Sequence, residues 1–283
     1  MWFSEFENIG GVMASVPKII HYCWFGRNPL PELAQKCIAS WKKFLPDYEI
    51  KEWNESNYDV RKIPYIAQAY DAKKYAFVSD YARFDILYQY GGVYFDTDVE
   101  VIKDLRPIIE KGAFIGVEKG TRPLLNAGLG IASPAASEIY HEILESYAKE
   151  QFVKEDGSLN LKTVCERVSE IFTKYGFVEK DILQNVAETT IYPSEYFCPK
   201  SPKTFKLCIT DNTFTVHHYD GSWLQEDMKQ LFKEKQWISK HISFLPIRFI
   251  LEKLCVIKKI LFSFLHRIYL YKIFSRIRIN IQT

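Results

Sequence analysis

The chain has 283 residues, of which 47% are hydrophobic, 25% charged and 16% aromatic, and its formal net charge is +2. This composition excludes a disordered or collagen-like chain and is typical of one globular domain, alone or with an appendage. The charge is unevenly distributed, because nine Lys and Arg residues lie from Lys240 onward against a single acid, Glu252. The chain is therefore an acidic body with a basic tail.

The cysteines and the apolar stretches of the sequence indicate the cellular compartment in which the protein is expected. The six cysteines are irregularly spaced and form no CxxC pair, which argues against a zinc site or a dense disulfide framework. Residues 1–18 contain neither an early positive charge nor a sustained apolar stretch, so no secretory signal is expected. No stretch reaches about 18 uninterrupted apolar residues, and we expect no membrane-spanning helix. These features predict a reduced, cytoplasmic protein.

The first elements alternate between strand and helix. Residues 16–24 (VPKIIHYCW) predict a strand, residues 31–45 (PELAQKCIASWKKFL) a helix, and residues 48–53 (YEIKEW) a second strand. This order is typical of the start of an α/β nucleotide-binding sheet.

A long helical pattern follows over residues 65–90. Aromatic residues recur along one stripe of it at spacings of three and four: Phe77, Tyr81, Phe84 and Tyr88. The glycine pair 91–92 ends the helix. The next residues, VYF, predict a short buried strand that brings Asp96 and Asp98 to its carboxyl end, where open α/β sheets bind ligands.

Later segments complete the expected α/β domain. FIGVE, NAGLGIAS and FTVHHY predict strands, and SEIYHEILESYAKE and LKTVCERVSEIFTKY predict helices. We expect a catalytic domain over residues 1–240, followed by a helical tail over residues 241–283. The tail combines apolar clusters with basic residues and suits an anionic membrane surface, although packing on the domain or on a dimer partner is an alternative.

Asp96 and Asp98 flank Thr97, and in an extended backbone their side chains would point the same way. Two neighbouring carboxylates repel each other unless a cation lies between them. Mg²⁺ and Mn²⁺ prefer oxygen ligands and are held by one or two carboxylates together with substrate phosphates. The pair suits a metal bound to a diphosphate, whereas a bare DxD triplet more often marks an ordinary solvated turn.

Asp80 and Arg83 lie three residues apart in the predicted helix and share a face. They form either a simple helix ion pair or an acceptor and donor set for sugar hydroxyls.

The composite SDxxRxxxLxxxGGxYxDxD, formed by residues 79–98, resembles the DXD-containing sugar transferases of glycosyltransferase family 32. That family includes capsular polysaccharide enzymes and yeast-type mannosyltransferases. The segments VPKIIHYCWFG and VHHYDGSW are also similar to family motifs, so the resemblance covers residues 16–224, most tightly 74–101. It implies an α/β GT-A fold, with a Rossmann-like mixed sheet flanked by helices. It also implies a retaining, metal-dependent transfer of a sugar from a UDP- or GDP-sugar to a glycan acceptor.

The resemblance also implies a role for each matching residue. Mn²⁺ or Mg²⁺ would be held by Asp96, Asp98 and His218. Strand alternation would turn His217 the opposite way, so we favour His218 as the histidine ligand. The expected catalytic residues are Asp80, Arg83, Asp96 and Asp98. The expected donor-binding residues are Trp24, which would stack on the base, and Asp80, Arg83, Tyr94, Asp96, Ser222 and Trp223, while Asn126 would line the acceptor side.

The implied mechanism has the metal draw off the nucleoside diphosphate while the acceptor hydroxyl enters on the same face. No residue is assigned as general base, and the leaving phosphate is the candidate proton acceptor. We expect a cytoplasmic enzyme of bacterial surface or capsular polysaccharide synthesis, peripheral on the inner face of the membrane. Its acceptor would be a lipid-linked glycan, and no nucleic-acid partner is expected.

The sequence leaves two alternatives to an active transferase. A haloacid-dehalogenase-type phosphatase also uses a DxD motif after an apolar strand, but there the motif opens the domain, whereas Asp96 lies far along this chain. A catalytically silent, glycan-binding relative at the membrane is the second alternative. The presence of both aspartates, Arg83 and the HxxGSW ending argues against it.

Overall fold

The computed structural model describes most of the first 221 residues and a few short pieces beyond them. The described residues are 15–120, 122–201, 206–221, 230–231, 234–235, 237–238, 250–251 and 253–254. The chain divides into two compact units: Met1–Ser201 with Leu207–Tyr219, and Pro202–Lys206 with Asp220–Thr283. The elements named below all belong to the first unit. The expected tail over 241–283 lies almost wholly outside the described residues, and the domain boundary at residue 240 stays a prediction.

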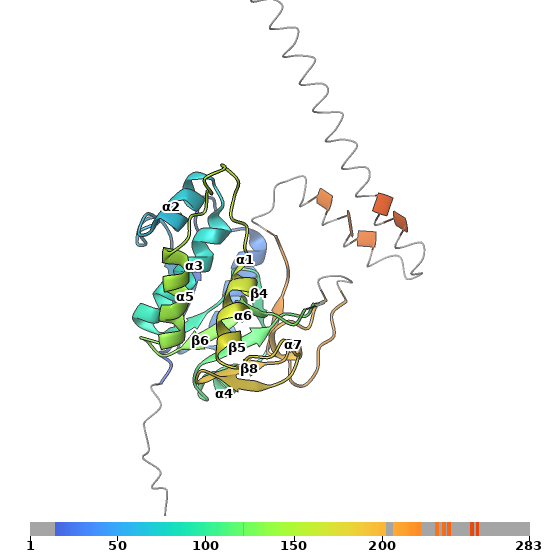
Figure 1. Ribbon diagram of the computed structural model, residues 1–283. Coiled ribbons are helices and arrows are strands. Elements are labelled where there is room, and N and C mark those ends of the chain that lie inside the picture. The colour runs from blue at the N-terminus through green and yellow to red at the C-terminus, as the bar shows by residue number, and fades with distance from the viewer. Residues whose placement is uncertain are drawn as a thin grey trace, which may run out of the picture. The chain divides into compact units, whose positions relative to one another are not determined.

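A mixed seven-stranded sheet forms the centre of the first unit (Figure 1), in the order β2-β1-β3-β6-β5-β8-β7. β1 pairs in parallel with β2 and β3, and β5 with β8, whereas β6 and β7 run antiparallel to their neighbours. The strands are β1 Ile19–Cys23, β2 Glu49–Trp53, β3 Gly92–Tyr94, β5 Phe114–Val117, β6 Leu125–Ser133, β7 Gln184–Val186 and β8 Thr189–Tyr192. A separate antiparallel pair joins β4 Val99–Val101 to β9 Thr215–His217.

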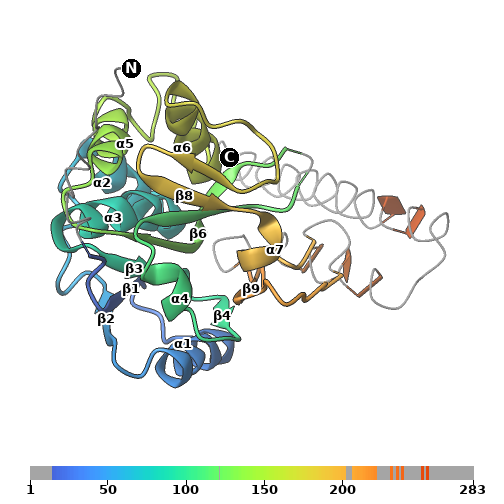
Figure 2. The ribbon, with the colours of Figure 1, turned by 90° about the horizontal axis from the view of Figure 1, so that it is seen from below.

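Helices cover both faces of the large sheet (Figure 2). They are α1 Glu32–Phe44, α2 Pro64–Asp71, α3 Tyr75–Tyr90, α4 Arg106–Ile109, α5 Glu138–Ala148, α6 Val164–Lys174 and α7 Ser194–Phe197. One apolar cluster contains side chains of α2, α3, α5 and α6, and a second contains side chains of α1, α4, α7 and β4. Strand side chains alternate between the two clusters, as a sheet buried on both faces requires. The expected mixed α/β sheet flanked by helices is confirmed.

The long helix predicted over residues 65–90 is in fact two helices, α2 and α3. They are separated by a short break in which Lys73 adopts a left-handed conformation, with φ of 56°. This conformation is uncommon for a residue other than glycine, and the sequence therefore carries no signal for it. The aromatic stripe is confirmed, because Tyr81 and Phe84 are buried and Phe77 and Tyr88 pack beside them.

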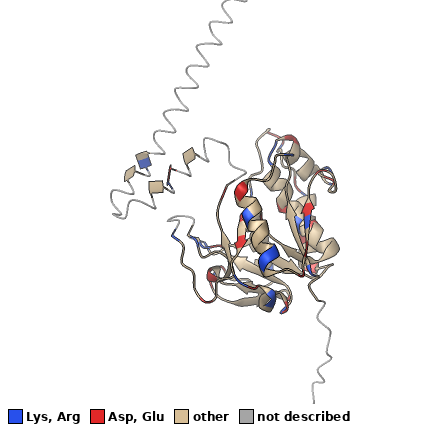
Figure 3. Ribbon diagram, turned by 180° about the vertical axis from the view of Figure 1, so that it is seen from behind, with Lys and Arg blue, Asp and Glu red and all other residues tan. Residues whose placement is uncertain are grey.

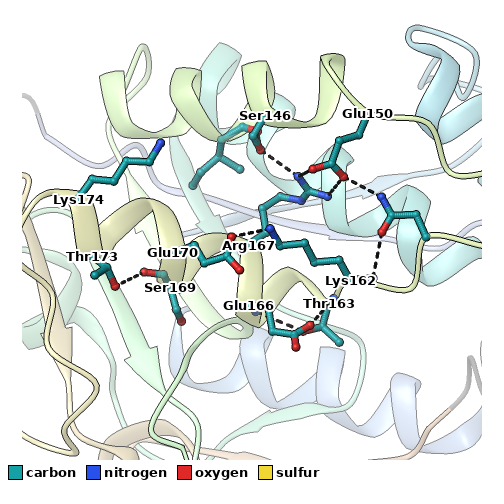
Figure 4. A network of polar contacts seen from close by, with 12 residues as sticks. Ser146, Glu150, Lys162, Thr163, Glu166, Arg167, Ser169, Glu170, Thr173 and Lys174 are labelled. Atoms are coloured by element: carbon teal, nitrogen blue, oxygen red, sulfur yellow. Dashed lines mark hydrogen bonds and ion pairs between the residues drawn. The ribbon is translucent and has the colours of Figure 1, made fainter. Parts of the chain in front are cut away.

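A buried arginine joins α5 and α6 (Figure 4). Arg167 of α6, with 2% of its side chain exposed, donates from Nη2 to Glu150 Oε2 at 2.7 Å and from Nη1 to Ser146 Oγ at 3.2 Å. On the same helix, Ser169 Oγ accepts a hydrogen bond of 2.9 Å from the backbone N–H of Leu125. These contacts attach α6 both to α5 and to the start of β6.

Charged residues of both signs are interspersed over the described ribbon (Figure 3). Several of them form surface ion pairs, such as Arg61 with Asp71 at 2.6 Å. Such exposed pairs contribute little to stability. In the part of the chain that the structure describes, no helix combines the length and the apolar character needed to cross a membrane.

His21 is a buried residue of β1 that contacts two neighbouring strands and the end of α3. Its Nε2 lies 2.9 Å from the carbonyl oxygen of Gly91, and its Nδ1 accepts a hydrogen bond of 3.1 Å from Trp53 Nε1. Burial lowers the pKa of His21 to about 4, so the imidazole is neutral at pH 7. Gly92 allows this packing, because a Cβ there would meet His21 Nε2 at 3.0 Å.

We expect the free energy of unfolding to decrease as the pH falls from 6.5 towards 4. Over this range the unfolded chain, with an ordinary histidine pKa of 6.5, binds a proton that folded His21 does not. This difference in pKa corresponds to a loss of up to about 3 kcal/mol in the free energy of unfolding. Urea unfolding of the wild type and His21→Gln at pH 7 and pH 4.5 measures it. The wild type should lose more stability than the variant, and equal losses would contradict the prediction.

Candidate active site

Asp96 and Asp98 lie in a tight turn, here called the DTD turn (residues 96–98), which follows β3. The strand ends at Tyr94, and the backbone N–H of Val99 donates to the carbonyl oxygen of Asp96 at 3.1 Å. Aspartate is favoured at the first position of such turns. The backbone is therefore not extended through the DTD turn, and the two carboxylates have different surroundings.

Asp96 is held by an arginine and a tyrosine. Arg83 of α3 approaches Asp96 Oδ1 to 3.2 Å with its Nη2, and the same Nη2 donates to Asp80 Oδ1 at 2.8 Å. The hydroxyl of Tyr94 donates to Asp96 Oδ1 at 3.1 Å, and the Arg83 guanidinium lies 4.9 Å from the centre of the Tyr94 ring. These contacts bring together four of the residues expected at the site.

Burial strengthens the electrostatics of this group. Only 4% of the Arg83 side chain is exposed, and its Nη1 is buried with no hydrogen-bond partner among the described residues. Burial raises the pKa of Asp80 to about 6, although the Arg83 charge opposes the shift. Burial by itself would lower the pKa of Arg83. The neighbouring Asp96, Tyr94 and Asp80 have the larger combined effect, so the pKa is raised above its ordinary value. The guanidinium therefore stays charged.

Gly128 makes room for Asp96 on the neighbouring strand β6. The backbone N–H of Asp96 donates to the carbonyl oxygen of Gly128 at 3.2 Å, and a Cβ at Gly128 would overlap Asp96 Oδ2. Asn126, two residues earlier in β6, is 8% exposed and accepts from the Gly128 N–H through Oδ1 at 2.7 Å. The structure thus places Asn126 beside the DTD turn, and its position on the acceptor side stays a prediction. Gly128 was not anticipated, since nothing in the sequence showed which strand would neighbour Asp96.

The strand pair β4–β9 brings two histidines to the DTD turn. His217 Nε2 lies 3.2 Å from Asp98 Oδ1, and 12% of the His217 side chain is exposed. His218 Nε2 lies instead 2.8 Å from Glu100 Oε2, which also pairs with Lys36 at 3.0 Å. The histidine beside Asp98 is therefore His217, whereas His218, the expected metal ligand, lies beside Glu100. The two histidines do point in opposite directions, as the alternation of side chains along a strand requires. Which of them contacts Asp98 is decided by the conformation of the DTD turn.

The donor set around Asp98 fits a hard divalent cation in part. Burial by itself would lower the pKa of His217. The carboxylates of Asp98, Asp96 and Glu118 have the larger combined effect, so the pKa is raised above its ordinary value. His217 Nδ1 is buried and has no hydrogen-bond partner within the described ranges. No three His, Cys, Asp or Glu side chains of the described part lie close enough to form a complete metal site. The carboxylate oxygens suit Mg²⁺ or Mn²⁺ when water and phosphate oxygens supply the other ligands.

Trp24 lies on the same edge of the sheet as the DTD turn. It follows β1, which is parallel to β3, so both segments leave the sheet at its carboxyl edge. The Trp24 ring is half-buried, and its Nε1 donates to the carbonyl oxygen of Asn28 at 2.6 Å. Its stacking on a base stays a prediction. Ser222 and Trp223 lie outside the described residues.

Comparison with known families identifies this segment. Residues 31–115 match the family described as "Glycosyltransferase sugar-binding region containing DXD motif", and the match runs from α1 to β5 through the DTD turn. This segment is similar to the DXD-containing glycosyltransferases. The resemblance to the sugar transferases of family 32 is thereby confirmed.

The chain is similar to two curated proteins of Schizosaccharomyces pombe. Inositol phosphoceramide mannosyltransferase 3 is 33% identical over 109 residues, 36% of this chain and 30% of that protein. Inositol phosphoceramide mannosyltransferase 1 is 30% identical over 123 residues, 40% of this chain and 37% of that protein. The matches therefore span about a third of the length of these relatives. Among solved structures, the PaToxG glycosyltransferase aligns with 56% of this chain and 69% of its own, at 19% identity and a TM-score of 0.42.

Gly128→Ala should weaken Mn²⁺-dependent binding of a nucleoside diphosphate. The new methyl group displaces the Asp96 carboxylate from Arg83, and misplacing a metal-ligand carboxylate typically costs about 10- to 100-fold in affinity. Calorimetric titration with UDP and GDP in the presence of Mn²⁺ measures the loss. Glu155→Ala, at an exposed position away from the DTD turn, is the control. Unchanged affinity in a folded Gly128→Ala protein would contradict this account of the glycine.

Proposed function

We propose that this chain is a retaining, metal-dependent glycosyltransferase that moves a sugar from a UDP- or GDP-sugar to a glycan acceptor. The observation that carries the proposal is the DTD turn, in which Asp96 is locked by a buried Arg83 and Asp98 pairs with His217. The turn lies at the carboxyl edge of the sheet and within the segment that matches the DXD-containing glycosyltransferases. Such edges are where α/β sheets bind their ligands.

Asp96, Asp98 and a histidine would hold Mn²⁺ or Mg²⁺. We assign the histidine to His217 in place of His218, because His217 contacts the Asp98 carboxylate. When bound, the ion would neutralise charge that develops on the leaving diphosphate. Ser222 and Trp223 would contact that diphosphate from the following segment.

The remaining residues would bind and orient the donor. Arg83 has a buried Nη1 without a partner among the described residues, and Asp80 offers a carboxylate beside it. Together they provide a fixed donor and an acceptor for sugar hydroxyls. Trp24 would stack on the base, and Tyr94 would hold Asp96 in place. Asn126 would line the acceptor side of the site. The acceptor hydroxyl would approach the donor sugar on the same face from which the diphosphate leaves.

The acceptor in this proposal is a lipid-linked glycan, used in bacterial surface or capsular polysaccharide synthesis at the inner face of the membrane. The nine basic residues from Lys240 onward, opposed by one acid, suit an anionic membrane surface. The names of the two curated relatives specify a lipid, inositol phosphoceramide, as the molecule they mannosylate. No nucleic-acid partner is proposed.

A panel of UDP- and GDP-sugars tests the function. We expect the purified chain to hydrolyse one donor with Mn²⁺ and none with EDTA. Asp98→Asn should reduce this turnover at least about 100-fold, because it removes a charge that stabilises the leaving group through the ion. Glu110→Asn, an exposed site on another part of the unit, is the control. A folded wild type that turns over no donor, with or without an added glycan, would support the silent glycan-binding alternative.

The two histidines are expected to differ in their effect on the metal. His217→Ala should weaken Mn²⁺ binding, measured by electron paramagnetic resonance of free Mn²⁺, about 10-fold or more. His218→Ala should weaken it less, because the His218 ring contacts Glu100 and not Asp98. The reverse order would restore His218 as the ligand.

A further inference from the structure

Glu118 is a carboxylate at the carboxyl edge of the sheet that the mechanism above does not use. It follows β5 directly, and its backbone N–H donates to the carbonyl oxygen of Leu124 at 2.8 Å, so the β5–β6 hairpin fixes its backbone. The residue is half-buried and forms no ion pair within the described ranges. A half-buried carboxylate without a cation is costly to keep unless a ligand or a hydrogen bond compensates it.

A tyrosine with an uncommon backbone conformation lies near Glu118. The hydroxyl of Tyr219 lies 2.9 Å from Cys198 Sγ, and its pKa is raised by burial, by Cys198 and by the nearby Glu118 carboxylate. Tyr219 has a φ of 57°, a conformation uncommon for a non-glycine residue, and such strain is found most often at functional sites. Cys165 Sγ also donates to Glu118 Oε2 at 3.7 Å. The Cys165 thiol of α6 therefore orients the carboxylate.

The same tyrosine connects Glu118 to the metal-binding side of the site. Its ring lies 4.3 Å, centre to centre, from the ring of His217, which contacts Asp98. Glu118 is also one of the three carboxylates that raise the pKa of His217. It is thus near the DTD turn, although it does not join a cluster of three metal-binding groups in the described part of the chain.

The strand order gives the direction of a bound donor. Along the carboxyl edge, Trp24 follows β1, the DTD turn follows β3, Asn126 lies at the start of β6, and Glu118 follows β5. With the base on Trp24 and the diphosphate at the DTD turn, the transferred sugar and its acceptor continue towards β6 and β5. Glu118 lies at that end.

We infer that Glu118 is a further catalytic residue, which binds the attacking hydroxyl of the acceptor and takes its proton. The inference rests on the proposed transferase function. The acceptor oxygen bonds to the anomeric carbon as the bond from that carbon to the diphosphate oxygen breaks. The electron pair of the broken bond leaves with the nucleoside diphosphate, and the hydroxyl proton passes to the Glu118 carboxylate. In donor hydrolysis, water takes the place of the acceptor hydroxyl.

Glu118→Gln separates this role from a structural one, because the amide keeps a hydrogen-bond acceptor for Cys165 but cannot take a proton. With the donor found in the panel, the hydrolytic kcat should fall about 100-fold or more, with an unchanged donor KM. Calorimetry with Mn²⁺ and UDP or GDP should give wild-type affinity. Glu118→Asp, which restores a carboxylate on a shorter side chain, should recover part of the rate. The control is Glu166→Gln, whose carboxylate caps α6.

The outcomes separate the two proposals. Wild-type hydrolysis by a folded Glu118→Gln protein would overturn the assignment of Glu118 and leave the transferase function intact. A loss of UDP or GDP affinity equal to the loss in kcat would also overturn it, because Glu118 would then serve donor binding. If the wild type turned over no donor, the proposed function would fail and the role of Glu118 with it.

Discussion

The buried guanidinium of Arg83 is the interaction on which the rest of the site depends. Its Nη2 contacts Asp80 and Asp96, so one cation offsets two carboxylates in a region from which water is largely excluded. Removing one partner of such a group typically costs about 3–5 kcal/mol, because the charge left behind is uncompensated. The surplus negative charge, together with Asp98, makes the site receptive to a further cation.

The fold supplies what this charged group needs. The helix α3 presents Asp80 and Arg83 on one face, and the glycines at its end return the chain into the sheet immediately before the DTD turn. The small β4–β9 sheet then holds Asp98 from the other side, because the backbone N–H of His218 donates to the Asp98 carbonyl oxygen at 3.0 Å. The two aspartates are thus fixed by different parts of the fold, separated by more than a hundred residues in the sequence.

Sequence predicted the features that depend on local periodicity. The first strand, helix and strand, the aromatic stripe of α3 and the shared face of Asp80 and Arg83 all follow from spacing along the chain, whereas their grouping with Asp96 was implied by the family motif. The family motif added Asn126, which does lie beside the DTD turn. Features that depend on contacts distant in the sequence were not predicted. These include the break at Lys73, the choice of His217 at Asp98, and the room that Gly128 leaves for Asp96.

A crystal structure with Mn²⁺ and UDP or GDP, with the ion located by its anomalous scattering, tests the central claim most directly. The account predicts one Mn²⁺ ion bound by the Asp96 and Asp98 carboxylates and by diphosphate oxygens, with the base on the Trp24 side of the DTD turn. An ion or a diphosphate bound elsewhere, with Asp96 still paired to Arg83 and Asp98 to His217, would contradict it.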